Sequence, residues 1–335
     1  MKARRVRLSV LVSASLVGLG TLAVAAGARE RDPEVLTPPP PRAVSPHLYV
    51  DPSSAAVTAV RSLERAGKKS EAAIIRRIAD QPAAVWFTDD RPGYADRARR
   101  LAAAATAARR MPVLSLYFIP YRDCSGHSAG GAADAAAYRR WVTALAGALR
   151  GHRAIVVLEP DAVAQAVRGC LSPARRTERL ELLRYAIATL RKAPGVRIYL
   201  DAGNPTWIPA GEIGPALRTA GVGAAAGFAL NVANFETTAD NMRYGLAVSR
   251  TIGGKHFVVD TSRNGNGPAQ RGAGNRHWCN PAGRKLGPVP TLSTGYSLVD
   301  AYLWVKRPGE SDGACAPGQP PAGRWFPAYA LGLAR

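Results

Sequence analysis

Two acidic side chains stand at the end of an apolar segment, at a spacing that could support acid–base chemistry. The segment is VVLEPDAVAQ, residues 156–165, where three apolar residues run into Glu159 and Asp161 with Pro160 between them. A charge at the rim of a core costs free energy unless it is paired or useful. The two acids are therefore candidates for proton transfer, and the next question is which elements position them.

Seven apolar segments recur along the chain, and most are nearly continuously hydrophobic rather than alternating. They are residues 84–88, 113–120, 154–160, 197–203, 227–235, 257–263 and 301–306. This pattern is typical of parallel strands that are buried on both faces. The Ala- and Arg-rich segments between them have helical spacing, at residues 94–110, 132–150, 174–193 and 238–252. Alternating strands and helices predict an α/β fold with a parallel sheet.

Polar and aromatic residues gather after nearly every predicted strand. In chain order they are Trp86, Asp89, Tyr117, Asp123, Glu159, Asp161, Asp201, Asn204, Trp207, Asn231, Asn234, Asp260, Arg263, Asn264, Lys306, Glu310 and Asp312. The carboxyl ends of the strands form the active-site face of α/β barrels, so we expect one concave site here. Carboxylates can transfer protons, amides bind hydroxyl groups and aromatic rings offer apolar faces, a combination that suits a sugar chain.

The composition excludes some partners and leaves others open. The chain has 335 residues, of which 47% are hydrophobic, and a formal net charge of +21. Such a charge is compatible with nucleic acid, an anionic membrane or an acidic polymer as partner. The basic residues are scattered and not interleaved with aromatic ones, which favours a solvated surface over a nucleic-acid groove. The glycine-containing stretches GNPTW and RNGNG lack the features of a phosphate-binding loop.

The N-terminus has the layout of a secretory signal peptide. Lysine and arginine residues between positions 2 and 7 precede an apolar stretch from Leu8 to about Ala26. We expect residues 1–28 to be a signal peptide or, since the stretch can span a bilayer, an N-terminal anchor. Residues 29–46 contain four consecutive prolines and predict an extended linker before a single catalytic domain at 47–335. We therefore expect a secreted, extracellular protein, with anchoring at the cell surface as the alternative.

The cysteines predict disulfides rather than a metal site. Cys124, Cys170, Cys279 and Cys315 are an even number, as expected for an exported chain with two disulfides. No pair has C-x-x-C spacing, and we expect the five histidines not to cluster with the cysteines, so zinc is not expected. Three pairings are possible, of which the simplest joins Cys124 to Cys170 and Cys279 to Cys315.

Nine stretches, taken together, resemble glycoside hydrolase family 6, the secreted cellulases that include endoglucanases and cellobiohydrolases. In order they are HLYVDPSSAA, AVWFTD, YFIPYRDCSGHSAGG, VVLEPDAVA, YLDAGNPTWI, GFALNVANFETT, FVVDTSRNGNGP, WCNPAGRKLG and LWVKRPGESDG. The resemblance implies a distorted, seven-stranded, TIM-like parallel β/α barrel. It also implies hydrolysis of β-1,4-glucan with inversion at the anomeric carbon. Inversion requires a carboxylic acid that protonates the leaving oxygen and a base that activates water on the opposite face.

The resemblance implies roles for three aspartates. Asp161 of LEPDAVA is then the general acid, and its pKa must be raised so that it stays protonated. Asp123 of YRDC would help to hold this proton by like-charge coupling and would relay a proton from water. Asp312 of GESDG matches the residue that is often proposed as the base. We interpret Glu159 as part of the frame that positions the loop.

Substrate-binding residues follow from the same resemblance. Trp86, Trp207 and Trp278 match indoles that stack on sugar rings, and Tyr117 matches a tyrosine that distorts the sugar at the cleavage point. The remaining expected contacts are Ser128, Asp201, Asn204, Asn234, Lys306 and Glu310, with a purely structural role for Asp201 left open. Asn204, followed by Pro205, stands where the family commonly has histidine, which bears on substrate preference. We expect no cofactor, no metal, no nucleic-acid partner, no membrane contact beyond a possible N-terminal anchor, and a monomer.

The loops predict endo-acting cleavage. Little chain separates Cys279 from Cys315, and Cys315 follows GESDG almost at once. The chain therefore has little length with which to roof the cleft, and we expect an open cleft and an endo-β-1,4-glucanase. The alternatives are an exo-acting cellobiohydrolase, a hydrolase of mixed-linkage β-glucan, and a non-catalytic glucan- or cell-wall-binding protein on the same scaffold.

Overall fold

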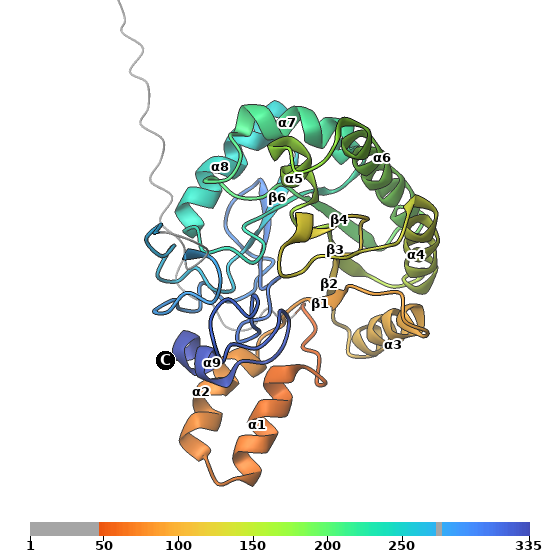
Figure 1. The fold of residues 1–335 in the computed structure, drawn as a ribbon. Coiled ribbons are helices and arrows are strands. Elements are labelled where there is room, and N and C mark those ends of the chain that lie inside the picture. The colour runs from red at the N-terminus through yellow and green to blue at the C-terminus, as the bar shows by residue number, and fades with distance from the viewer. Residues whose placement is uncertain (1–46, 273–276) are drawn as a thin grey trace, which may run out of the picture. The chain divides into compact units, whose positions relative to one another are not determined.

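The computed structural model describes residues 47–272 and 277–335, which contain one seven-stranded sheet (Figure 1). Its strands are β1 (Val85–Phe87), β2 (Val113–Leu116), β3 (Ala154–Leu158), β4 (Val196–Asp201), β5 (Gly227–Leu230), β6 (His256–Asp260) and β7 (Val299–Leu303). They pair in chain order, and every neighbouring pair is parallel. Each strand overlaps a predicted segment, so the prediction of seven parallel strands is confirmed.

Helices surround the outside of the curled sheet (Figure 1). They are α1 (Ala55–Arg65), α2 (Lys69–Ala79), α3 (Tyr94–Ala107), α4 (Ala135–Ala148), α5 (Ala162–Arg168), α6 (Pro173–Leu190), α7 (Ala210–Thr219), α8 (Thr238–Thr251) and α9 (Pro327–Ala334), with the short 3₁₀ helices η1 (Asp123–Ser125) and η2 (Val222–Ala224). The four segments predicted as helical correspond to α3, α4, α6 and α8. Local capping marks some of their starts, since Asp134 and Thr237 accept hydrogen bonds from first-turn N–H groups of α4 and α8.

Burial on both faces explains the continuous hydrophobic strands. Successive side chains of a strand point to opposite faces of the sheet. On β3, Ile155 and Val157 belong to the cluster inside the barrel. Val156 and Leu158 belong to the cluster between the sheet and the surrounding helices. A polar residue at either set of positions would face a core, so the sequence does not alternate.

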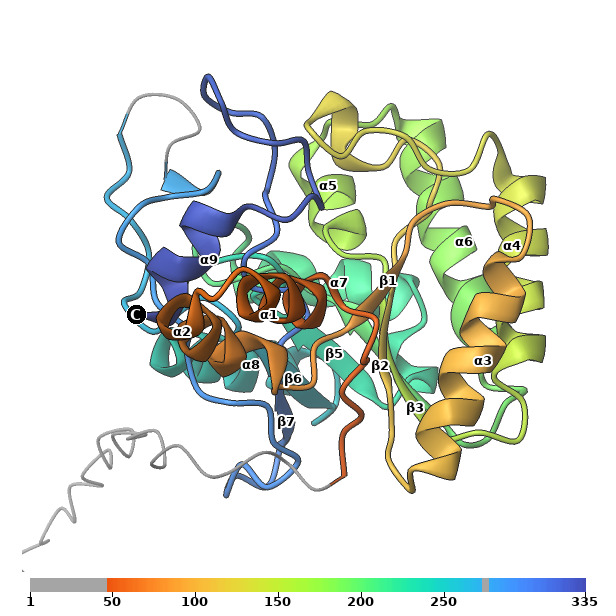
Figure 2. The same cartoon turned by 90° about the horizontal axis from the view of Figure 1, so that it is seen from below.

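The barrel closes where the residues just before β1 meet the residue just after β7. The N–H of Ala84 donates to the carbonyl oxygen of Trp304 at 2.9 Å, where Ala83 and Trp304 form an isolated parallel bridge. Trp304 is 1% exposed and packs in one cluster with residues of α1, α2 and α9. Figures 1 and 2 show α9 beside α2. The sheet is thus a distorted barrel whose edges meet in an isolated bridge rather than a continuous ladder.

The first described residues lie at the amino ends of the strands. Met111, just before β2, donates its N–H to the carbonyl oxygen of His47 at 2.8 Å and accepts from the N–H of Tyr49 at 3.0 Å. Leu48 between them is 1% exposed and belongs to the cluster inside the barrel. Leu48 therefore fills the amino end of the barrel interior.

The expected signal peptide or anchor (1–28) and linker (29–46) lie outside the described residues. The described residues, 47–272 and 277–335, all belong to one compact unit. Among the helices of the described residues, none is both long and apolar enough to cross a membrane.

Replacing Leu48 with alanine should lower the free energy of unfolding by about 2–5 kcal/mol, because a buried side chain is removed and a cavity remains. Chemical denaturation measures the loss. Leu331→Ala, at a half-buried position on α9, is the matched control and should cost less. Equal losses for the two variants would contradict the importance of Leu48 for the barrel interior.

Candidate active site

A cleft of about 820 Å³ lies at the carboxyl ends of the strands. It brings together almost all the predicted site residues, although they come from separate loops. Those on its wall are Trp86, Tyr117, Asp123, Ser128, Asp161, Asn204, Trp207, Asn234, Trp278, Lys306, Glu310 and Asp312. Asp201 and the four cysteines are not on the wall. The residues after seven different strands thus meet in one hollow, as the pattern of strand ends predicts.

Asp161 is held in an unusual backbone conformation at the start of α5. Its φ is 69°, in the left-handed region, and its N–H donates to Oδ2 of Asp201 at 2.9 Å. Such a conformation persists only where the surroundings enforce it. Burial, together with the negative charge of Asp123, raises the pKa of Asp161 to about 7. The carboxyl group therefore keeps its proton well above the pH at which an exposed aspartate loses it.

Asp201 lies beneath Asp161 rather than on the cleft wall. It is 1% exposed, and its Oδ2 accepts from the N–H groups of Asp161 and Gly203. Burial and the charge of Asp161 raise its pKa well above the ordinary value. Its position fits the structural role that the sequence left open, because it fixes the backbone that presents Asp161.

The side chain of Glu159, just after β3, is hydrogen-bonded to the backbone just after β2. Its side chain is fully buried and accepts from the N–H groups of Phe118 and Ile119 at 3.0–3.1 Å. Burial raises the pKa of Glu159 to about 7, although these N–H groups oppose the shift. The two acids of LEPD therefore differ, since Asp161 lies on the cleft wall and Glu159 holds the end of β2.

The loop that carries Asp123 is fixed by several contacts. Asp123 has a φ of 58°, and its Oδ2 accepts from the N–H of Ser128 at 2.6 Å. Arg122 donates to the carbonyl oxygens of Ser128, Thr88 and Tyr117. Arg122 lies next to Asp123 in the motif YRDC, and this position beside an acid was the available signal for its role.

Both disulfides of the local pairing are present, Cys124–Cys170 and Cys279–Cys315. The first ties the residue after Asp123 to the loop after α5. The second ties the loop before Asn280 to the loop that follows Asp312. The crosslinks therefore act on the two loops that carry acids of the cleft.

Arg179 is a buried cation for which the sequence had predicted no role. It lies on α6, is 2% exposed, and donates to Gln165 Oε1 and to the carbonyl oxygens of Pro120 and Tyr121. It therefore braces the chain just before the Asp123 loop. The available signal was an arginine on the apolar face of a predicted helix, beside Leu180 and Leu183.

Asp312 is engaged by two cations. Its Oδ2 lies 2.7 Å from Arg263 Nη1 and 3.0 Å from the N–H of Asn280, and its Oδ1 lies 3.1 Å from Lys306 Nζ. The side chain is 6% exposed. Burial raises its pKa, but the charges of Arg263 and Lys306 outweigh burial and lower it below the ordinary value. A carboxylate held this way is a weak base, because its lone pairs and charge are already used.

Two aromatic rings of the cleft wall, those of Trp86 and Tyr117, are in contact. The rings of Trp86 and Tyr117 are 5.5 Å apart at 88°, and Trp86 Nε1 donates to the carbonyl oxygen of Val305 at 2.7 Å. Such edge-to-face contact and a satisfied indole N–H fix the ring orientation. The amide of Asn204 accepts from Thr206, and Glu310 pairs with Arg307 at 2.7 Å. The cleft thus combines fixed apolar faces with polar groups.

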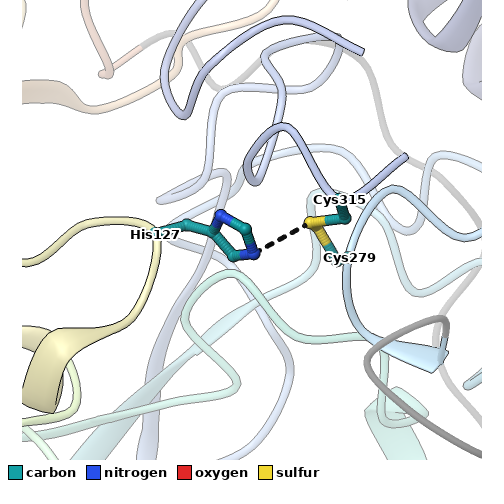
Figure 3. A group of neighbouring side chains, drawn as sticks. All are labelled: His127, Cys279 and Cys315. Carbon is teal, nitrogen blue, oxygen red and sulfur yellow. Dashed lines mark hydrogen bonds between the residues drawn. A yellow bond between two sulfur atoms is a disulfide. The ribbon is translucent and has the colours of Figure 1, made fainter. Parts of the chain in front are cut away.

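His127 lies beside the second disulfide, as Figure 3 shows. Its Nε2 is 3.4 Å from Sγ of Cys315. Both sulfur atoms of this group are in the disulfide with Cys279 and so cannot act as thiolate ligands. The group therefore offers a metal ion only one imidazole and does not fit a metal centre in this form.

Residues 126–130 read GHSAG, which matches the G-x-S-x-G pattern of serine hydrolases. The nucleophile elbow of those enzymes is a turn from a strand into a helix. Here the stretch follows η1 in a loop, where Arg122 bridges to Gly130. Ser128 therefore lacks the setting of such a nucleophile.

The model of the family described as glycosyl hydrolases family 6 matches residues 43–335. The chain belongs to this family. As a member of family 6 it is a glycoside hydrolase. The resemblance read from the nine stretches is thus confirmed.

Relatives of this family 6 chain include proteins named endoglucanases. Endoglucanase A of Cellulomonas fimi is 41% identical over 294 residues, which cover 86% of this chain and 61% of that protein. Endoglucanase 1 of Streptomyces halstedii is 40% identical over 305 residues, which cover 87% of this chain and 91% of that protein. The match therefore extends over nearly all of the second relative but under two thirds of the first.

Solved structures show the same fold. The endoglucanase Cel6 from Mycobacterium tuberculosis, in complex with methyl-cellobiosyl-4-deoxy-4-thio-β-D-cellobioside, superposes with a TM-score of 0.81 and 45% identity. The match covers 86% of this chain and 96% of that one. Endoglucanase Cel6B from Humicola insolens, at 28% identity, has a TM-score of 0.72 and matches 87% and 96% of the two chains. The seven-stranded barrel is therefore the fold of the family.

Replacing Asp123 with asparagine should move the alkaline limb of the kcat profile to lower pH. An acid catalyst with a pKa of about 7 loses activity as the pH rises through that value. The charge of Asp123 raises the pKa of Asp161, so its removal lowers that pKa. The measurement is kcat against pH on a soluble β-glucan. Asp90→Asn, a change at an exposed acid, should leave the limb in place. An unmoved limb for the first variant would refute the coupling.

Replacing Asp312 with asparagine should destabilise the fold by about 3–5 kcal/mol, because Arg263 and Lys306 then stay buried with no anionic partner. Denaturant titration measures this change. Asp123→Asn is the matched control and should cost less, since no salt bridge to Asp123 occurs among the described residues. A loss confined to kcat, at unchanged stability, would instead identify Asp312 as the base.

Proposed function

We propose that this chain is an inverting endo-β-1,4-glucanase that cleaves internal bonds of cellulose or a related soluble β-glucan, with Asp161 as the general acid. The observation that carries the proposal is the raised pKa of Asp161 on the wall of a cleft lined by indoles and amides. A protonated carboxyl group can donate to the glycosidic oxygen as the bond breaks. The names of the relatives, which are endoglucanases at about 40% identity, support the same substrate class.

Asp123 is the proposed acceptor of the proton from the attacking water. Its Oδ2 is held by the N–H of Ser128, and its charge already couples to Asp161. When Asp161 gives up a proton and Asp123 gains one, the pair carries one proton before and after the step. Asp312 has the opposite setting, since its two cationic partners hold it as an anion. In this proposal Asp312 contributes a fixed negative charge and not a base.

The indoles and amides hold the glucan. Trp86, Trp207 and Trp278 offer flat faces to sugar rings, and Tyr117 lies against Trp86 near both acids. Asn204, Asn234, Lys306 and Glu310 supply polar groups to hydroxyls along the same wall. The chain acts as a monomer. It acts outside the cytoplasm, and the two disulfides support this location because such bonds persist in oxidising compartments.

The test is cleavage of carboxymethylcellulose by wild type and Asp161→Asn. Wild type should lower the viscosity of the solution quickly relative to the reducing ends it releases, because internal bonds are cut. Early products should carry the inverted, α-anomeric configuration. The variant should lose about 10²–10⁴-fold in kcat, the usual contribution of a positioned proton donor. Residual kcat within tenfold of wild type would exclude Asp161 as the acid.

The rival activities have separate outcomes in the same experiment. Binding of the glucan without release of reducing ends would support a non-catalytic binding protein and overturn the proposal. Faster cleavage of barley mixed-linkage glucan than of carboxymethylcellulose would assign a different substrate. Release of cellobiose with little fall in viscosity would indicate an exo-acting enzyme.

A further inference from the structure

Basic residues concentrate at the end of the barrel opposite the cleft. The segments that enter the strands, here called the N-terminal face, are residues 80–84, 108–112, 149–153, 191–197, 218–226, 250–256 and 287–300. Because all neighbouring strands are parallel, these segments lie at the same edge of the sheet. Figure 2 shows the connection from α3 to β2 at this edge, with the dark blue loop after β7 at the other.

The charge of this face is nearly all of one sign. Its lysine and arginine residues are Arg109, Arg110, Arg150, Arg153, Arg191, Lys192, Arg197, Arg218, Arg250 and Lys255. The acidic residues in the same segments are Asp80 and Asp300. Asp300 is already engaged by Arg197 at 2.7 Å and by Nδ1 of His256 at 2.9 Å. The charged residues on the cleft wall, at the other end of the strands, are of both signs, whereas the N-terminal face is almost entirely basic.

Most of these side chains are exposed and have no anionic partner. The side chains of Arg109, Arg150, Arg153, Arg191, Lys192, Arg218 and Arg250 are exposed. Within residues 47–272 and 277–335, none of these seven forms an ion pair. Uncompensated charge of one sign repels itself and opposes compact folding. Its concentration on one end therefore calls for an explanation.

Compensation of helix dipoles does not account for the pattern. Cations stabilise a helix within its last turn, where the partial negative charge lies. Of the helices that lead into this face, α2, α7 and α8 have basic residues there, which are Arg76 and Arg77, Arg218, and Arg250. The last turns of α3, α4 and α6 have none. Their bases lie after the last turn, where the dipole contributes less.

The arrangement fits a flat partner better than a linear one. The bases surround the end of the barrel, on the connections into β2, β3, β4, β5 and β6, and the cleft lies at the other end. A linear polyanion is usually bound along a groove. The described chain also begins at this face, where His47 pairs with Met111. The sequence before it holds the apolar stretch from Leu8 to about Ala26, which is long enough to enter a bilayer.

We propose that the N-terminal face binds an anionic phospholipid membrane and turns the cleft away from it. Each lysine or arginine close to an anionic bilayer adds attraction that falls off within a Debye length. The cleft at the opposite end stays open to a polymer in solution. His47, the first described residue, lies at the face that contacts the membrane.

The test measures co-sedimentation of residues 36–335 with phospholipid vesicles. This part contains every described residue, all of which belong to one compact unit with the whole described core, and it leaves out the apolar stretch. The vesicles are phosphatidylcholine alone, or equal parts of phosphatidylcholine and phosphatidylglycerol. The test variant changes Arg150, Arg153, Arg191 and Lys192 to glutamine. The control variant removes the same charge from α1, the turn after it and the first residue of α2. It changes Arg61, Arg65, Lys68 and Lys69 to glutamine.

Wild type should bind the phosphatidylglycerol vesicles, bind phosphatidylcholine alone far less, and dissociate at high salt. The test variant should bind on the order of 100-fold more weakly, because four charges next to the bilayer are lost. The control variant should bind much more tightly than the test variant. Both variants should keep wild-type activity on soluble glucan, which shows that they fold.

Three results would overturn the proposal. The first is no binding of wild type to the anionic vesicles at low salt. The second is an equal loss in the test and control variants, which would mean that net charge acts without a preferred face. The third is displacement from vesicles by soluble polygalacturonate at a lower concentration of negative charge, which would assign a linear polyanion instead.

Discussion

The proton on Asp161 depends on two physical effects, its enclosure by protein and the negative charge of Asp123. Both require the carboxyl group to stay where the fold puts it. Its backbone has positive φ and donates to Asp201, whose buried carboxylate would otherwise lack this partner. Arg179 opposes the effect of Asp123 on the pKa and braces the chain just before the Asp123 loop. The pKa of Asp161 is thus set by a balance of buried charges rather than by one contact.

The carboxylates at this end of the barrel have different properties because their partners differ. Glu159 is enclosed and accepts from backbone N–H groups, so it acts as a fixed link between β2 and β3. Asp312 is nearly as enclosed, yet Arg263 and Lys306 keep its pKa low. Similar residue types at similar depth therefore titrate in opposite directions. The nearest cations, and not burial alone, decide which carboxylates can hold a proton.

The same architecture separates charge along the barrel. In parallel β/α units, every strand begins at one end and finishes at the other, so the two kinds of loop never mix. The loops that precede strands are almost entirely basic, whereas the cleft wall, on the loops that follow strands, carries acids and bases in equal number. One fold can thus present a polar cleft and a basic surface that do not interfere. Part of the high net charge is in this way localised on the face away from the site.

The sequence by itself determined the seven strands, the parallel sheet and the composition of the cleft, because apolar continuity and the residues after each strand are local patterns. It did not reveal helices such as α7, whose Gly214 and Pro215 lower helix propensity while packing against α8 favours the helix. Only the tertiary structure decided the states of the acids. The charge of Arg179 acts on the pKa of Asp161, and Arg263 forms an ion pair with Asp312, although both arginines are distant in the sequence. Asp201, which was expected on the cleft wall, lies beneath Asp161. Desolvation and Coulomb energies depend on distance through space, which spacing along the chain does not record.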